Sequence, residues 1–160
     1  MRKQQRRMVA HGAIVILIAL AAGFGLVISL IGGFEVFPGT IIAFDFPGDP
    51  SKWARTHAGG ILNGILVMTG ALVIHAMDLP QKTATRLAWM LVGTGYANTL
   101  FYWGALFAPS RAVTFGDNRL GHSNLAGVLG FAPALVFAFI TMIAMVILMR
   151  HGFSKADSDD

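Results

Sequence analysis

Four long apolar segments, separated by shorter and more polar stretches, dominate the chain. They cover residues 8–31, about 53–77, about 83–107 and about 124–149. A helix of about 20 apolar residues crosses the hydrocarbon core of a bilayer, so each segment is long enough to span it. Pro133 interrupts the fourth segment, but a transmembrane helix tolerates a proline. The pattern therefore predicts one domain, residues 1–160, that forms an all-α membrane protein with a four-transmembrane-helix bundle.

Positive charges lie mostly on one side of these segments. The amino-terminal tail, the turn 78–86 and the carboxyl-terminal tail together carry eight Lys and Arg residues, and the two other connections carry four. Because short cytoplasmic loops carry the excess of Lys and Arg, both termini are predicted to be cytoplasmic. A basic start also occurs in signal peptides, but residues 8–31 are too long for a signal-peptide core. We therefore expect a retained first helix, and a disordered polar tail over residues 154–160.

The connection between the first two segments, residues 32–50, is long and rich in aromatic side chains. Its phenylalanines are Phe34, Phe37, Phe44 and Phe46. Aromatic residues gather at the membrane–water interface, so this stretch is interpreted as part of an aromatic belt. A second interpretation, a lid that folds back over a buried site, stays open.

Composition supports the membrane interpretation and narrows the possible chemistry. Apolar residues make up 55% of the chain and charged residues 12%, whereas soluble domains carry about 25% charged residues. The chain has no cysteine, which excludes disulfides, thiolate metal sites, iron–sulfur clusters and cysteine nucleophiles. Much of the positive charge lies in the first seven residues, which indicates a membrane-flanking anchor rather than a nucleic-acid surface. No carboxylate pair lies in the apolar segments, and no phosphate-binding or hydride-transfer glycine motif is present.

Polar side chains inside membrane segments are costly, and they usually face a cavity or a partner. In this chain they are His11, His57, Asn63, His75, Asn98 and Tyr102. Asp49 and Pro50 have the pattern of a helix start, which puts His57 in the second turn of the helix that follows. The nearby pair Gly60 and Gly64 is typical of close helix packing, in which His57 would bond to a neighbour. The alternative is that His57 ligates a metal or a haem iron.

The other polar residues allow two interpretations as well. Asn63 follows His57 by six residues, so the two point about 120° apart on a helix and would share only a broad cavity or a subunit boundary. Asn98 and Tyr102 are four residues apart and share a helix face, where they could bind an oxygen atom or bond to another helix. His11 and His75 lie near cytoplasmic helix ends and His122 lies in an outer loop. We interpret these three as interfacial or solvated residues.

Several short motifs in a fixed order resemble the styrene oxide isomerase family, from about residue 11 to residue 133. The motifs that carry the resemblance are Gly32-Gly33-Phe34-Glu35, Pro38-Gly39, Pro47-Gly48, Trp53-Ala54-Arg55 with His57, Leu62-Asn63-Gly64, Ala97-Asn98, Phe101-Tyr102 and Thr114-Phe115-Gly116.

The resemblance implies an enzyme of the bacterial inner (cytoplasmic) membrane that works as a homotrimer of four-helix subunits, with haem b near the subunit interface. His57 would be the axial ligand of the ferric haem iron, and Asn63 and Tyr102 would bind and orient the substrate. The implied substrate is a small hydrophobic aryl epoxide, and no nucleic acid is involved. Styrene oxide would become phenylacetaldehyde by Lewis-acid opening of the epoxide and a 1,2-hydride shift.

Two other functions remain open from the residues alone. A membrane haem protein for electron transfer or sensing would need two strong axial ligands, whereas Lewis-acid catalysis needs one free position. A structural membrane protein without a cofactor would use His57 only as a hydrogen-bonding residue.

Overall fold

The computed structural model describes the backbone of residues 1–159 and the side chains of residues 1–154. Four helices make up most of the chain, and a small sheet lies between the first two. The elements are α1 (Lys3–Ile31), β1 (Gly33–Phe37), β2 (Thr40–Ala43), α2 (Pro50–Ala76), α3 (Gln81–Phe107) and α4 (Leu125–Asp159). The four predicted helices are present. The all-α class needs one correction, because residues 33–43 form a β-hairpin rather than an irregular connection.

The outer two helices extend beyond the apolar segments that predicted them. α1 begins at Lys3 instead of residue 8, and Arg2 before it donates hydrogen bonds to Asp78 and to the Leu79 carbonyl in the α2–α3 turn. α4 continues to Asp159 instead of residue 149, so the expected disordered tail is helical as far as it is described; residue 160 lies outside the described residues. Hydropathy marks the part of a helix that suits lipid, whereas polar turns can prolong a helix into water.

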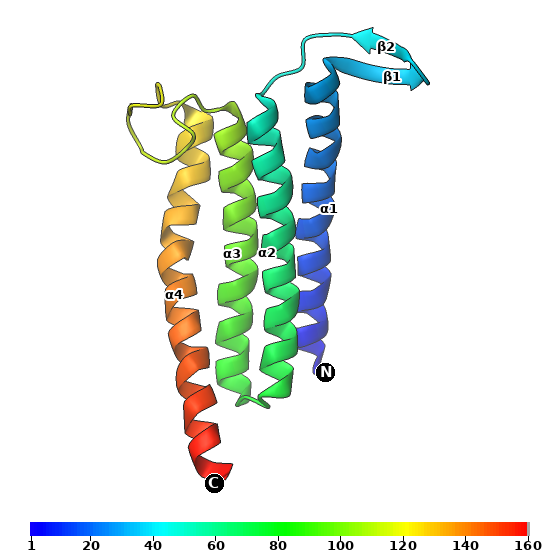
Figure 1. Ribbon diagram of the computed structural model, residues 1–160. Coiled ribbons are helices and arrows are strands. Elements are labelled where there is room, and N and C mark those ends of the chain that lie inside the picture. The colour runs from blue at the N-terminus through cyan, green and yellow to red at the C-terminus, as the bar shows by residue number, and fades with distance from the viewer. Residues whose placement is uncertain (160) are drawn as a thin grey trace.

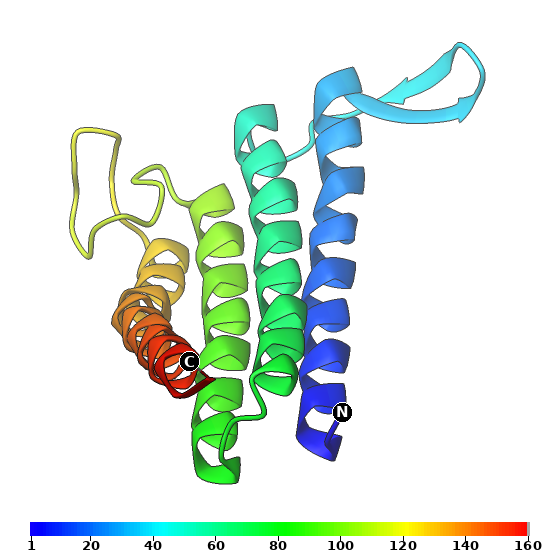
Figure 2. The ribbon, with the colours of Figure 1, turned by 60° about the horizontal axis from the view of Figure 1, so that its bottom comes forward.

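The helices stand side by side in an open row. α1 packs on α2, α2 on α3 and α3 on α4, with a smaller contact between α1 and α3. Figures 1 and 2 show the same order from two directions, with both termini at one end and the hairpin and the loop after α3 at the other. Because α1 and α4 form the two edges of the row, both helices leave many apolar side chains exposed.

Glycines bring α1 and α2 into close contact. A Cβ atom added at Gly60 would lie 2.6 Å from the Ala19 Cβ atom, and one at Gly64 would lie 2.7 Å from the Gly12 carbonyl oxygen. Any larger side chain at these positions would push the helices apart. The close-packing interpretation of the Gly60 and Gly64 pair is thus confirmed.

The hairpin points away from the helices and does not cover them (Figure 1). Its strands are antiparallel, and the turn contains Gly39, at a φ of +81° that favours glycine. The Glu35 carboxylate accepts a hydrogen bond from the Gly39 amide and closes this turn. Phe34 and Phe37 are both more than half exposed. Within one chain, the hairpin is therefore no lid over the helix row.

Three helices are long and apolar enough to cross a membrane, namely α1, α2 and the Leu125–Ser154 part of α4. Three helices of this length and composition are characteristic of a membrane protein. α3 is as long as α2, but its sequence is more polar, and it does not meet the same criterion among the described residues.

Candidate functional site

The start of α2 sets the position of His57. Asp49 is the N-cap, and its carboxylate accepts a hydrogen bond from the Ser51 amide at 2.7 Å, while Pro50 occupies the first turn. The hydrogen bonds from Ser51 lower the pKa of the Asp49 carboxyl. The predicted helix start is confirmed, and it places His57 in the second turn, near the end of the helix row that carries the hairpin.

The His57 ring is held against α1. Its Nδ1 atom lies 2.9 Å from the Ala19 carbonyl oxygen, and a Cβ atom added at Gly23 would come within 2.9 Å of the ring. A carbonyl only accepts, so Nδ1 carries the hydrogen, and in the neutral imidazole Nε2 keeps its lone pair. Among the described residues, Nε2 has no hydrogen-bond partner. The hydrogen bond to a neighbour, one of the two interpretations of His57, is therefore present. The free Nε2 is also what a metal-ligating imidazole requires, so the second interpretation stays a prediction.

Asn63 and Tyr102 meet at Gly59, on the side of α2 that faces α3. The Asn63 amide donates to the Gly59 carbonyl at 2.7 Å, and its own oxygen accepts from the Asn98 amide at 2.8 Å. The Tyr102 ring lies on the Gly59 backbone, so close that a Cβ atom there would overlap the ring. Within the described part of the chain, the Tyr102 hydroxyl has no hydrogen-bond partner. Asn98 of α3 therefore bonds to α2, which confirms the prediction of a hydrogen bond between helices for this residue.

One chain does not bring all the predicted site residues together. His57 packs on α1, whereas Asn63 and Tyr102 lie between α2 and α3. The angular separation expected from the helix period therefore persists in the tertiary structure. A site that used all three residues would have to extend around α2.

Three further histidines, His11, His75 and His122, lie elsewhere. His11 shares a hydrogen bond of 2.9 Å with the Tyr96 hydroxyl, between α1 and α3. His75 is exposed in the last turn of α2. His122 is exposed and pairs with Asp117 at 2.8 Å in the loop after α3. In the part of the chain that the structure describes, no three His, Asp or Glu side chains form a metal-binding group. Sequence reasoning did not identify Tyr96 as the partner of His11.

A small cavity beside Tyr102 is lined by cationic side chains. Its lining residues are Lys52, Arg55, Thr56, Tyr102, Ala105, Leu106 and Arg111. Lys52 and Arg55 lie close to His57 in the sequence, but helical position alone does not assign either of them a role. No signal in the sequence indicated Arg111, because that residue comes from the loop after α3 and only the fold brings it to the start of α2.

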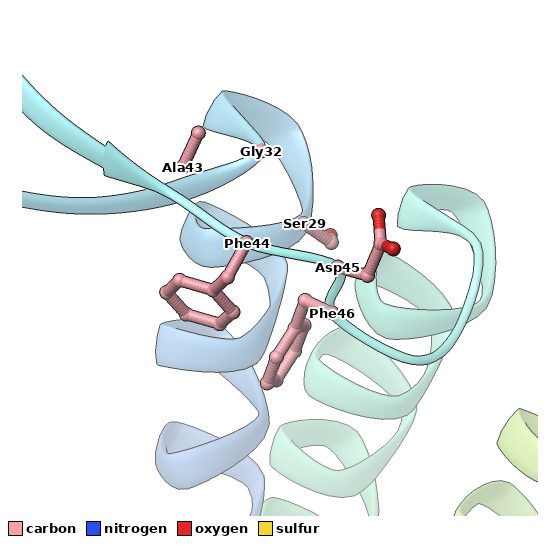
Figure 3. A pocket seen from close by; sticks show the side chains of 6 residues that line it. All are labelled: Ser29, Gly32, Ala43, Phe44, Asp45 and Phe46. Atoms are coloured by element: carbon pink, nitrogen blue, oxygen red, sulfur yellow. The ribbon is translucent and has the colours of Figure 1, made fainter.

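An open cavity of about 520 Å³ lies at the hairpin end of α1, and none of these site residues lines it (Figure 3). Phe44, Asp45 and Phe46 form one wall, and the carboxylate of Asp45 points in the opposite direction to the two aromatic rings. Phe46 stacks on Trp53 at 5.3 Å, and the Trp53 indole donates to the Pro47 carbonyl. Trp53 therefore anchors the connection from the hairpin to α2.

The similarity of the sequence to known proteins extends over almost the whole chain. Residues 4–153 match the model of a family described as styrene oxide isomerase. The chain is 38% identical over 154 residues to the styrene-oxide isomerase of Pseudomonas fluorescens, in an alignment that covers 96% of this chain and 91% of that protein. The resemblance inferred from the motifs is confirmed. The chain therefore belongs to the styrene oxide isomerase family and is an isomerase.

Proposed function

We propose that the protein converts aryl epoxides into aldehydes, with styrene oxide giving phenylacetaldehyde, and that it does so with a haem b held by His57. Family membership supports the reaction type. The observation that carries the haem assignment is the hydrogen bond between His57 Nδ1 and the Ala19 carbonyl, because it leaves Nε2 as a free ligand atom.

The residues around His57 suit a haem. The imidazole is fixed in the tautomer that ligates iron, and the ring rests on glycine rather than on a bulky side chain. Arg55, Lys52 and Arg111 line one cavity at the same end of α2. Their positive charges complement carboxylates such as the haem propionates. We therefore assign the iron to His57 and the propionates to this cationic group, which, like Tyr102, would come from the neighbouring copy.

The chain's own residues would bind and orient the substrate. Bound haem would supply a ferric Lewis acid that weakens the benzylic carbon–oxygen bond of the epoxide. The Tyr102 hydroxyl and an N–H of Asn63 would donate hydrogen bonds to the epoxide oxygen and oppose its reorientation. Positive charge that develops on the benzylic carbon spreads over the aryl ring. A hydride then shifts from the neighbouring carbon, so atoms and electrons balance within the substrate. Apolar surroundings would keep water from forming a diol.

The reaction site would be shared between subunits of a homotrimer. His57 and the Asn63–Tyr102 pair lie on different sides of α2, so a second copy is needed to complete a site with all three. Exposed apolar side chains on α1, α4 and the hairpin offer surfaces for lipid and for neighbouring copies. This arrangement agrees with the trimer that the resemblance implies.

All four helices, we propose, cross the inner membrane of a bacterium, with both termini in the cytoplasm. α3 is more polar than the others, but its polar side chains bond to other helices. Tyr96 bonds to His11 of α1, Asn98 to Asn63 of α2, and Thr94 to Thr141 of α4. Because these groups are satisfied inside the protein, their polarity is no obstacle to a membrane position.

Single-cysteine variants test this arrangement, because the chain has no cysteine of its own. Gln81→Cys places a thiol at the exposed first residue of α3, and Val113→Cys places one at an exposed position just beyond its last residue. In spheroplasts, a membrane-impermeant maleimide should label Val113→Cys at once and Gln81→Cys only after permeabilisation. Labelling of both positions in intact spheroplasts would show that α3 does not cross.

The haem proposal is tested with His57→Ala. Protein purified in detergent from haem-replete cells should show a Soret band and form phenylacetaldehyde from styrene oxide, and His57→Ala should lose both. His75→Ala is the matched control, because His75 is exposed on the same helix, and it should keep both properties. Full activity in haem-free protein would refute the role of haem. A wild-type protein that binds haem but leaves styrene oxide unchanged would refute the reaction.

A further inference from the structure

We propose that Asn98 is a positioning residue, which holds the Asn63 amide in the one orientation that presents an N–H to the epoxide oxygen. The inference rests on the proposed function, in which Asn63 contacts the substrate. It concerns a hydrogen-bond chain that links α3 to α2 through three groups: the Asn98 amide, the Asn63 amide and the Gly59 carbonyl.

The last acceptor in this series, the Gly59 carbonyl, sets the direction of both hydrogen bonds. The Gly59 carbonyl can only accept, and it lies 2.7 Å from the nitrogen of the Asn63 amide. The Asn63 oxygen then faces Asn98, whose amide nitrogen donates to it at 2.8 Å. Asn63 is only 8% exposed, so water does not readily replace either partner. Both contacts have the length of good hydrogen bonds.

A rotated Asn63 amide would lose both bonds. Its oxygen would face the Gly59 carbonyl, and its NH₂ group would face the Asn98 NH₂ group. Rotation of Asn98 as well would repair the second contact but not the first, since the backbone carbonyl cannot change from acceptor to donor. The pair of partners therefore selects one amide orientation.

This orientation matters for the proposed chemistry. An epoxide oxygen has no hydrogen to donate, so Asn63 helps only when an N–H faces it. In the observed arrangement one N–H is bound by Gly59, and the other remains for a ligand. Without the Asn98 donor, the buried Asn63 oxygen loses its partner, and the Gly59 carbonyl alone holds the amide in this orientation. Asn98 would thus act on the reaction through Asn63 rather than by touching the substrate.

A double-mutant cycle tests the inference on the haem-loaded protein. Asn98→Ala should lower kcat/KM for styrene oxide about fivefold to tenfold, the effect of one hydrogen bond, with kcat affected more than KM. Asn63→Ala should lower it further, and the double variant should be no worse than Asn63→Ala alone. Haem content and oligomeric state should not change. Thr99→Ala is the matched control, because Thr99 lies beside Asn98 and its hydroxyl donates to the Gly95 carbonyl of its own helix. This variant should retain wild-type activity.

Other results would overturn the inference. If the two single losses multiply in the double variant, Asn98 acts independently of Asn63. If Asn98→Ala does not assemble, Asn98→Leu, which fills the volume without a donor, takes its place in the cycle; failure of both to assemble would assign Asn98 to helix packing instead. Each of these results requires an active wild type. An inactive wild type would instead refute the proposed function.

Discussion

At the scale of single residues, the position of the Tyr102 ring depends on a glycine of the neighbouring helix. Its ring lies on Gly59, where a Cβ atom would come within 2.8 Å of the hydroxyl oxygen. The ring is thereby placed beside the Asn63 amide, which bonds to the same glycine. Packing fixes the ring, and among the described residues the hydroxyl has no hydrogen-bond partner.

Tyr102→Phe separates these two contributions, because it removes the hydroxyl and keeps the ring. Haem content should stay at the wild-type level, while turnover of styrene oxide should fall roughly a hundredfold, the effect of losing one donor to a developing negative charge. Absorption spectra and product analysis measure both quantities. Tyr96→Phe serves as the control, since Tyr96 bonds to His11. Undiminished turnover in Tyr102→Phe would exclude its hydroxyl from the reaction.

At the scale of elements, the loop between α3 and α4 is held by an ion pair that responds to pH. Asp117 accepts a hydrogen bond from His122 at 2.8 Å and another from the Ser123 amide. The bond with Asp117 raises the pKa of His122 above its ordinary value of 6.5, and the bond with His122 lowers the pKa of Asp117 below 3.8. The contribution of His122 is therefore fully present below about pH 6.5 and disappears as the pH rises through its raised pKa. That of Asp117 is present above about pH 3.8 and disappears as the pH falls through its lowered pKa.

The loop should accordingly be best ordered in mildly acidic solution. Trypsin cleavage after Arg119, an exposed residue of this loop, reports its opening. The cleavage rate of His122→Ala divided by that of the wild type should exceed one at pH 6 and approach one at pH 8.5. Taking this ratio removes the pH dependence of trypsin itself. A ratio that is the same at both pH values would show that the pair does not order the loop.

At the scale of the whole molecule, the open row of helices explains how a site can need more than one chain. α2 presents His57 toward α1 and Asn63 toward α3. Since the row does not close into a bundle (Figure 1), both edges remain available to lipid or to another copy. In a cyclic trimer, each interface joins different faces of two copies.

Mixed oligomers test this sharing of the site. His57→Ala and Tyr102→Phe chains with different tags should each be poorly active alone. When they are co-expressed and purified through both tags, one interface of a trimer would combine His57 from one chain with Tyr102 from the other. Activity should then recover to about a third of the wild-type value. Absence of recovery in mixed trimers that bind haem would place the whole site within one chain.

The sequence by itself determined the four helices and the start of α2, because a long, mostly apolar segment favours a helix and caps have a local signature. It also indicated that His57 and Asn63 point in different directions, since the helix period is local. It did not indicate the hairpin, because its exposed aromatic residues show no alternation of buried and exposed positions.

Only the tertiary structure decided which polar groups meet. Ala19 with His57, Asn98 with Asn63, and Arg111 beside Lys52 are pairs far apart in the chain, and their contacts depend on how helices rotate and pack. Hydropathy responds to the average polarity of a segment, whereas pairing depends on which face each side chain occupies. For the same reason α3 is too polar on average to meet the criterion for a membrane span, although its polar side chains form hydrogen bonds with neighbouring helices.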